Sequence, residues 1–270
     1  MSGDPFAIDN IISGKDTYKQ QRIMLYGVQG IGKSSAAASF EAPIAIRTED
    51  GMSALDIATF PQIATSFEDV AAAIEALHGK HPFKTVVLDS LDWLEPLIWA
   101  KTCQDLGINR IEDAGYGKGY ICADNNWRYI LGGFDSLRLN CGMQVVIIAH
   151  CEVKTFTPPD GDSYDRYQPK LHKRAFALWQ EWCDNVFFIN YRRRMVNRDD
   201  QGKIKRAEGD GGRTVFTQER PAYVAKNRWG MQPEIYINQD KTWRPLHDAL
   251  AQVIGDRYPY PANLMEKTAA

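Results

Sequence analysis

Residues 27–34 match the phosphate-loop pattern G-x-x-x-x-G-K-[ST] in full. Its glycines allow a tight loop whose backbone N–H groups turn inward and bind an anion. In such a loop the lysine reaches the β- and γ-phosphates, and the hydroxyl that follows it binds Mg²⁺. The sequence therefore predicts a site for ATP and Mg²⁺. The predicted nucleotide-binding residues are Gly27, Val28, Gln29, Gly30, Ile31, Gly32, Lys33, Ser34 and Ser35.

A triphosphatase also needs a metal-linked acid at the end of a buried strand. The apolar run at 84–88 is closed by Asp89, whose carboxylate can hold a metal-bound water opposite Ser34. Asp92 is the alternative acid, although we expect it within the helix that follows. We predict that Ser34 and Asp89 form the metal site.

Two further polar residues follow predicted strands. Glu49 comes after the run at 44–48 and could polarise the attacking water, with Asp50 as the competing residue and a solvated acidic turn as the alternative. His150 closes the run at 144–149 and could pass the state of the γ-phosphate to the segment behind it. The alternative for His150 is a histidine that only caps the sheet.

Apolar runs alternate with helical patterns, as in a parallel sheet that is covered on both faces. The pattern changes after residue 190, where turn residues separate short segments of a β-meander. The sequence predicts an α/β fold, with residues 1–20 as a possible subunit contact, 21–240 as the ATPase core and 241–270 as a C-terminal helix and tail. Strands are expected at 22–27, 43–48, 84–89, 144–149 and 184–190, helices at 33–40, 67–78, 91–105, 123–139, 171–182 and 245–257, and long loops at 107–122 and 151–169.

The composition is that of an ordinary globular protein. The 270 residues carry a net charge of −2, which argues against a protein that coats nucleic acid by overall charge but allows a local basic groove. The five cysteines form no C-x-x-C pair and are read as reduced thiols without a metal site. Without a secretory signal or an apolar run long enough for a membrane span, the expected location is the cytoplasm.

The order of these motifs, followed by Tyr223-Val224-Ala225-Lys226-Asn227-Arg228, resembles the RecA-like recombinase ATPases. The resemblance is closest to the short phage-encoded RecA-like proteins grouped with single-strand annealing proteins. It implies a RecA-like P-loop core with a mostly parallel sheet, flanking helices and an antiparallel C-terminal β extension. It also implies that Glu49 activates water and that His150, where the family usually has glutamine, senses the γ-phosphate. Lys226 and Arg228 would reach the nucleotide of a neighbouring subunit, so ATP would lie between protomers of a ring or filament.

The resemblance also assigns the two long loops to single-stranded DNA. Lysines and arginines would contact phosphates, and aromatic rings would stack on bases. The candidates are Lys118, Tyr120, Lys154, Phe156, Arg166, Tyr167, Lys170, Lys173 and Arg174. A second basic segment is either a DNA path or a solvated hairpin face, and it contains Arg192, Arg193, Arg194, Arg198, Lys203, Lys205 and Arg206.

The predicted function is ATP-dependent binding of single-stranded DNA that promotes annealing or homologous recombination in a phage context, in the host cytoplasm. Hydrolysis is expected to be stimulated by single-stranded DNA, with a single-strand-binding protein left open as a partner. Two alternatives use the same core: a hexameric helicase-like motor, and a DNA-binding module in which ATP serves only as an assembly switch. A small-molecule kinase is the weaker option, because no arginine-rich lid is evident.

Overall fold

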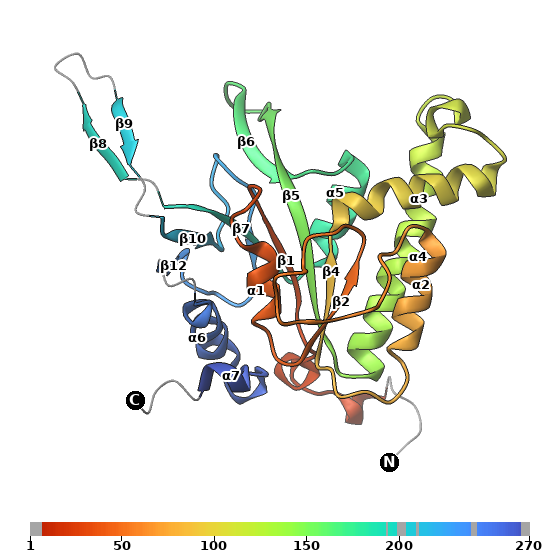
Figure 1. The fold of residues 1–270 in the computed structure, drawn as a ribbon, viewed down its shortest axis with the longest axis horizontal. Coiled ribbons are helices and arrows are strands. Elements are labelled where there is room, and N and C mark those ends of the chain that lie inside the picture. Colours follow the sequence, from red (N-terminus) through yellow and green to blue (C-terminus); the bar gives the residue numbers. More distant parts are fainter. Residues whose placement is uncertain (1–6, 193, 199–203, 209–210, 239–241, 266–270) are drawn as a thin grey trace.

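The computed structural model describes residues 7–192, 194–198, 204–208, 211–238 and 242–265. Within these residues a central sheet has the strand order β12-β10-β7-β1-β5-β4-β2-β3, with β11 paired to β7 and β6 to β5. Figure 1 shows the sheet between two layers of helices. The strands of this sheet are β1 (Arg22–Gly27), β2 (Pro43–Arg47), β3 (Ala58–Thr59), β4 (Thr85–Asp89), β5 (Gln144–Phe156), β6 (Tyr164–Pro169), β7 (Asn185–Tyr191), β10 (Arg213–Phe216), β11 (Lys226–Asn227) and β12 (Glu234–Ile237).

The six strands β1 to β5 and β7 pair in parallel, apart from the outer half of β5, whereas β6, β10, β11 and β12 pair antiparallel to their neighbours. The central strands are buried on both faces, which explains why their sequences are continuous apolar runs without alternation. The predicted α/β fold, mostly parallel with an antiparallel C-terminal extension, is confirmed.

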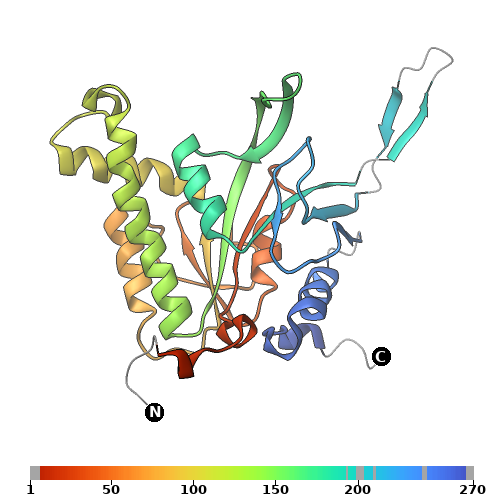
Figure 2. The same cartoon turned by 180° about the vertical axis from the view of Figure 1, so that it is seen from behind.

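Helices cover both faces of the sheet. One face is covered by α2, α3, α4 and α5, which Figure 2 shows from behind. Buried Trp127, Phe134 and Trp179 belong to the core on this face. The other face packs against the phosphate loop, α1 and α6. The helices are α1 (Lys33–Ala38), α2 (Phe67–Ala76), α3 (Leu91–Leu106), α4 (Lys118–Asn140), α5 (Lys173–Trp182), α6 (Arg244–Ile254) and α7 (Ala262–Met265), with 3-10 turns at η1 (Ile8–Asn10), η2 (Gly14–Thr17), η3 (Ile111–Ala114) and η4 (Gly255–Arg257).

The prediction of a long loop at 151–169 is wrong. Strand β5 continues through this segment to Phe156 and pairs with β6 in an antiparallel hairpin. Cross-strand contacts hold the outer part together: the rings of Phe156 and Tyr164 lie 5.6 Å apart, and the Thr155 hydroxyl donates to Asp165 at 2.7 Å. The hairpin projects from the carboxyl edge of the sheet (Figure 1).

The prediction of a loop at 107–122 is also wrong for much of its length. η3 occupies residues 111–114, and α4 already begins at Lys118. Gly119 lies so close to η3 that a Cβ there would be 2.2 Å from the Ile111 carbonyl oxygen. The glycines in this segment therefore allow a helix to pack against η3, in addition to forming turns.

A second hairpin, β8 (Arg194–Arg198) with β9 (Ile204–Glu208), projects on the same side of the molecule as the β5–β6 hairpin (Figure 1). It precedes β10 in the chain. Among the described residues, no helix has both the length and the apolar character to cross a bilayer.

Candidate nucleotide site

The phosphate loop joins β1 to α1 at the carboxyl edge of the sheet. Gly30 and Gly32 have φ angles of +72° and +101°, which side chains other than glycine rarely adopt. A Cβ on Gly27 would lie 2.2 Å from the carbonyl oxygen of Ile189 in β7. The Lys33 ammonium donates to the carbonyls of Gly27 and Val28, each at 3.2 Å, so the loop is folded around its own lysine.

The two predicted metal ligands contact each other. The Ser34 hydroxyl donates to the Asp89 carboxylate at 3.0 Å. Burial raises the pKa of Asp89 to about 6, although the hydrogen bond from Ser34 acts in the opposite direction. A hydroxyl and a buried carboxylate are the oxygen ligands with which Mg²⁺ is held beside substrate phosphates. These residues therefore fit a magnesium nucleotide.

A buried threonine that the sequence analysis did not identify joins the ends of β2 and β4. The Thr48 N–H donates to the Asp89 carbonyl at 2.7 Å, and its hydroxyl donates to the Ser90 carbonyl at 2.7 Å. The same hydroxyl accepts the Ser90 N–H at 2.8 Å. Thr48 thereby fixes the start of the following turn, which carries Glu49, next to the end of β4. The only sequence signal was a small polar residue between an apolar run and two acids.

His150 is held by Asp92 in α3. Its Nδ1 lies 3.0 Å from Asp92 Oδ2, and its backbone N–H donates to Asp92 Oδ1 at 2.9 Å. The hydrogen bond to Asp92 raises the pKa of His150 above its usual value despite partial burial. Burial alone would raise the pKa of Asp92, but the hydrogen bonds from His150 lower it. Asp92, considered above as an alternative metal ligand, instead orients this histidine.

Glu49 completes the group. Its carboxylate lies 3.9 Å from Nδ1 of His150, and its side chain is one-fifth exposed. Because Nδ1 of His150 faces two carboxylates, Nε2 is the nitrogen available to an incoming anion. The structure thus brings Lys33, Ser34, Asp89 and His150 together with Glu49, from four elements that are distant in sequence. Their roles in binding and hydrolysis stay predictions.

Burial lowers the pKa of Lys33, while nearby acids including Asp89, Asp92 and Glu49 act in the opposite direction. The site therefore concentrates negative side chains around a single buried ammonium. A bound divalent cation would reduce the repulsion among these carboxylates.

Next to the site lies another buried acid, Glu95 of α3. Its carboxylate accepts the backbone N–H of His172 at 3.0 and 3.1 Å, and burial raises its pKa to about 7. The His172 ring stacks on Tyr120 with centroids 4.1 Å apart, and the Tyr120 hydroxyl donates to Glu112 at 2.9 Å. Tyr120 is therefore engaged within the chain and does not present a free ring.

Lys226 and Arg228 lie away from the phosphate loop of their own chain. Lys226 pairs with Val186 of β7. The β7 residue that pairs with Gly27, at the end of β1, is Ile189, three positions further along the strand. Its ammonium donates to the Gln180 and Glu181 carbonyls at the end of α5, at 2.7 and 3.0 Å. Arg228 binds the Asp184 carboxylate at 3.1 Å.

The predicted DNA-contacting residues lie on helices or strands, apart from Lys170, which directly follows β6. Three side chains are engaged locally: Arg166 lies 3.9 Å from the Phe156 ring, Arg174 pairs with Asp124 at 2.9 Å, and Tyr167 stacks on Phe188. The four lysines of this set are exposed and lie on the β5–β6 hairpin, at its base or at the starts of α4 and α5: Lys118, Lys154, Lys170 and Lys173.

The predicted basic segment at 191–206 coincides with the β8–β9 hairpin. Arg193 and Lys203 lie outside the described residues. Arg192 stacks on the Tyr236 ring at 4.9 Å. Backbone pairing places Arg194, Arg198, Lys205 and Arg206 on the two strands.

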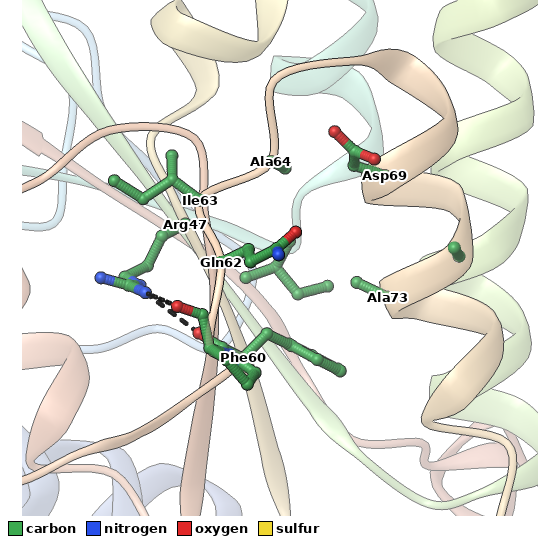
Figure 3. Close-up of a pocket in the computed structure, with 10 residues that line it drawn as sticks. Arg47, Phe60, Gln62, Ile63, Ala64, Asp69 and Ala73 are labelled. Carbon is green, nitrogen blue, oxygen red and sulfur yellow. Dashed lines mark hydrogen bonds between the residues drawn. The ribbon is translucent and has the colours of Figure 1, made fainter.

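A cavity of about 360 Å³ lies elsewhere, between β2, the segment at 60–64 and α2 (Figure 3). Arg47 borders it and donates to the carbonyls of Phe60 and Pro61 at 3.0 and 3.4 Å. Strand β2 is separated from β1 by β4 and β5, so this cavity is distinct from the phosphate loop.

Comparison with known proteins gives a family and a structural likeness. The family model AAA_24, described as an AAA domain, matches residues 19–229. The crystal structure of the RadB recombinase matches with a TM-score of 0.45 and 13% sequence identity, over 80% of this chain and 86% of that chain. No curated protein matches this sequence.

Proposed function

The chain belongs to the AAA_24 family of AAA domains, and from that premise we propose that it is an ATPase that binds single-stranded DNA and promotes strand annealing or recombination. The observation that carries the proposal is the position of His150. It faces the nucleotide site and lies within the same strand, β5, that extends into the projecting hairpin.

In this proposal Lys33 and Ser34 bind the triphosphate and Mg²⁺, and Asp89 completes the metal site. Glu49 positions the attacking water, while the His150 ring donates from Nε2 toward the γ-phosphate. The support is their assembly at one edge of the sheet, with Ser34 and Asp89 joined at 3.0 Å and Glu49 and His150 at 3.9 Å. Bound ATP supplies the phosphoryl group that is transferred to water.

Single-stranded DNA would bind along the β5–β6 hairpin and the adjoining helix starts. Lys118, Lys154, Lys170 and Lys173 are exposed there, and exposed lysines suit phosphates without selecting a sequence. The phage origin and the annealing role follow from the family resemblance described for the sequence.

We also propose a homo-oligomer with nucleotide at the subunit interface. Lys226 and Arg228 do not reach their own phosphate loop, which fits a role toward a neighbour's nucleotide. Ile8, Ile11 and Ile12 expose 82%, 76% and 62% of their surface, so the N-terminal segment offers apolar side chains to a second copy. Replacing the three isoleucines with serine should shift sedimentation toward the monomer.

The first test is steady-state ATP turnover with and without single-stranded DNA at low salt. Wild type should be stimulated by DNA, and Lys33→Ala should lose turnover under both conditions. Unchanged turnover on adding DNA would contradict the coupling between the two sites. If Glu49→Gln stops turnover but retains annealing, ATP acts as an assembly switch; directional unwinding of a duplex would instead indicate a motor.

The second test separates DNA contacts from overall charge. Replacing Lys170 and Lys173 with glutamine should reduce the slope of log K against log salt by about 1.4, because each single-strand phosphate contact contributes about 0.7. Lys80→Gln is the matched control, since Lys80 is exposed and precedes β4 at the opposite edge of the sheet. Equal slopes for the double variant and the control would refute the assigned path.

A further inference from the structure

Strand β10 places an arginine level with the phosphate loop. Gly27, at the end of β1, pairs with Ile189 of β7, and Ile189 pairs with Val215 of β10. Arg213 precedes Val215 by two residues and pairs with Tyr191 of β7. Because β10 runs antiparallel to β7, Arg213 lies past the end of β1. Residues two apart share a face, and Val215 packs in the same core as the phosphate loop and α1.

The Arg213 guanidinium lies against the loop itself. A Cβ on Gly32 would be 3.3 Å from both Cζ and Nη1 of Arg213. Cζ2 of Trp243 would also lie 3.3 Å from a Cβ on Gly32. The Nε1 of Trp243 donates to the Ser35 hydroxyl at 3.2 Å. Arg213 and Trp243 thus lie side by side against Gly32, and Trp243 also bonds Ser35; these two loop residues flank Lys33 and Ser34.

Among the described residues, this arginine is buried without an anionic partner. Arg213 is 7% exposed, and its Nε has no hydrogen-bond partner in the described part of the chain. No carboxylate among the described residues forms an ion pair with it, and its Cζ lies 5.9 Å from the centre of the Trp243 ring. A guanidinium stays charged at every physiological pH, and burying an unpaired charge is costly.

We propose that Arg213 is a phosphate ligand of the bound nucleotide, supplied by the same chain as the phosphate loop. Its planar fork of N–H donors matches phosphate oxygens, and the nucleotide would provide an anion that the described residues do not. The inference rests on the proposed nucleotide site and adds to it a residue more than 170 positions away from the loop in sequence. It differs from the role assigned to Lys226 and Arg228, which would act on a neighbour's nucleotide.

The test measures binding of a fluorescent ATP analogue to the full chain, and its displacement by inorganic tripolyphosphate. Arg213→Met leaves an unbranched but shorter side chain and removes the charge, and it should weaken the binding of both ligands about 10- to 100-fold. Arg213→Lys should lose less. Arg220→Met is the matched control, because the Arg220 guanidinium bonds only the neighbouring Glu219 carbonyl within the described residues. This control should bind like wild type.

The outcomes separate this inference from the proposed function. If wild type binds and Lys33→Ala does not, but Arg213→Met binds within twofold of wild type, Arg213 is not a ligand and the nucleotide site stands. Weaker ATP binding with unchanged tripolyphosphate binding would place Arg213 on the base and overturn the phosphate assignment. If wild type binds neither ligand, both proposals fail.

A purely structural role gives a different result. Unfolding of the nucleotide-free chain should occur at the same or a higher temperature in Arg213→Met, because an uncompensated buried charge is removed. A lower melting temperature with unchanged tripolyphosphate affinity would assign Arg213 to the fold and overturn the inference.

Discussion

Replacing Asp89 with asparagine should stabilise the nucleotide-free protein while removing one of the two proposed metal ligands. Asp89 is 3% exposed, and its pKa is about 6 in the folded chain against 3.8 for the free side chain. A difference of about 2.2 pKa units corresponds to about 3 kcal/mol of free energy of unfolding. The neutral amide of the Asp89→Asn variant avoids this cost, since its carbonyl oxygen can still accept the hydrogen bond from Ser34.

The pH dependence of this stabilisation follows from the raised pKa of Asp89. Because the folded state holds the proton more tightly, the carboxylate destabilises the fold only when the pH is high enough to ionise it. The cost is absent below about pH 4, reaches about half its value near pH 5, and is complete above pH 6. The gain from Asp89→Asn should therefore be about 3 kcal/mol at pH 8 and about half of that at pH 5.

The assay is urea unfolding in EDTA without nucleotide, at both pH values. Asp92→Asn is the matched control, because Asp92 lies three residues away and its pKa is lowered by His150, so this change should destabilise the fold. Asp89→Asn should also abolish the stabilisation that wild type gains from Mg²⁺ and ATP. A variant that is no more stable than wild type at pH 8, or whose gain does not shrink at pH 5, would refute the reasoning.

Gly27→Ala should lower the free energy of unfolding in the same urea assay by about 2–3 kcal/mol, because its Cβ would lie 2.2 Å from a carbonyl oxygen of β7. The control Gly14→Ala should have little effect, because a Cβ on Gly14 meets no atom within 4 Å. Glu95→Gln should raise the free energy of unfolding by up to about 3 kcal/mol above pH 7, because burial raises the pKa of Glu95 from 4.5 to about 7. In melting curves recorded over a pH series, this gain should vanish below pH 4.5. Asp92→Asn should lower the pKa of His150, measured by NMR titration of the imidazole, and an unchanged value would contradict the contact at 3.0 Å.

The parts of the site that could be predicted from sequence are those encoded by contiguous residues. The phosphate loop was predictable because its glycines, lysine and serine stand at fixed spacing. Asp89 and His150 were predictable as polar residues that follow apolar runs, although His150 lies inside a longer strand.

Other features depend on contacts between distant segments. The contact of Arg213 with Gly32 arises from the register of β10 on β7, which no local pattern encodes. The outer half of β5 is predicted as part of a loop because its sequence mixes polar and apolar residues and is no continuous apolar run. None of these residues is buried, so no apolar face marks the strand. Its pairing with β6 becomes visible only when both strands are in place.

The continuity of β5 has a mechanical consequence. From His150 to Phe156 the chain stays in one strand, stiffened by β6, over about 20 Å at about 3.3 Å per residue. If this outer part turned as a rigid unit about His150, it would act as a lever. A rotation of about 10° at His150 would move the tip by about 3.5 Å, half the spacing between alternate residues of a strand. In the proposed function, a local rearrangement around one imidazole would thus be amplified into a displacement of the hairpin on which single-stranded DNA would lie, without any loop having to fold or unfold.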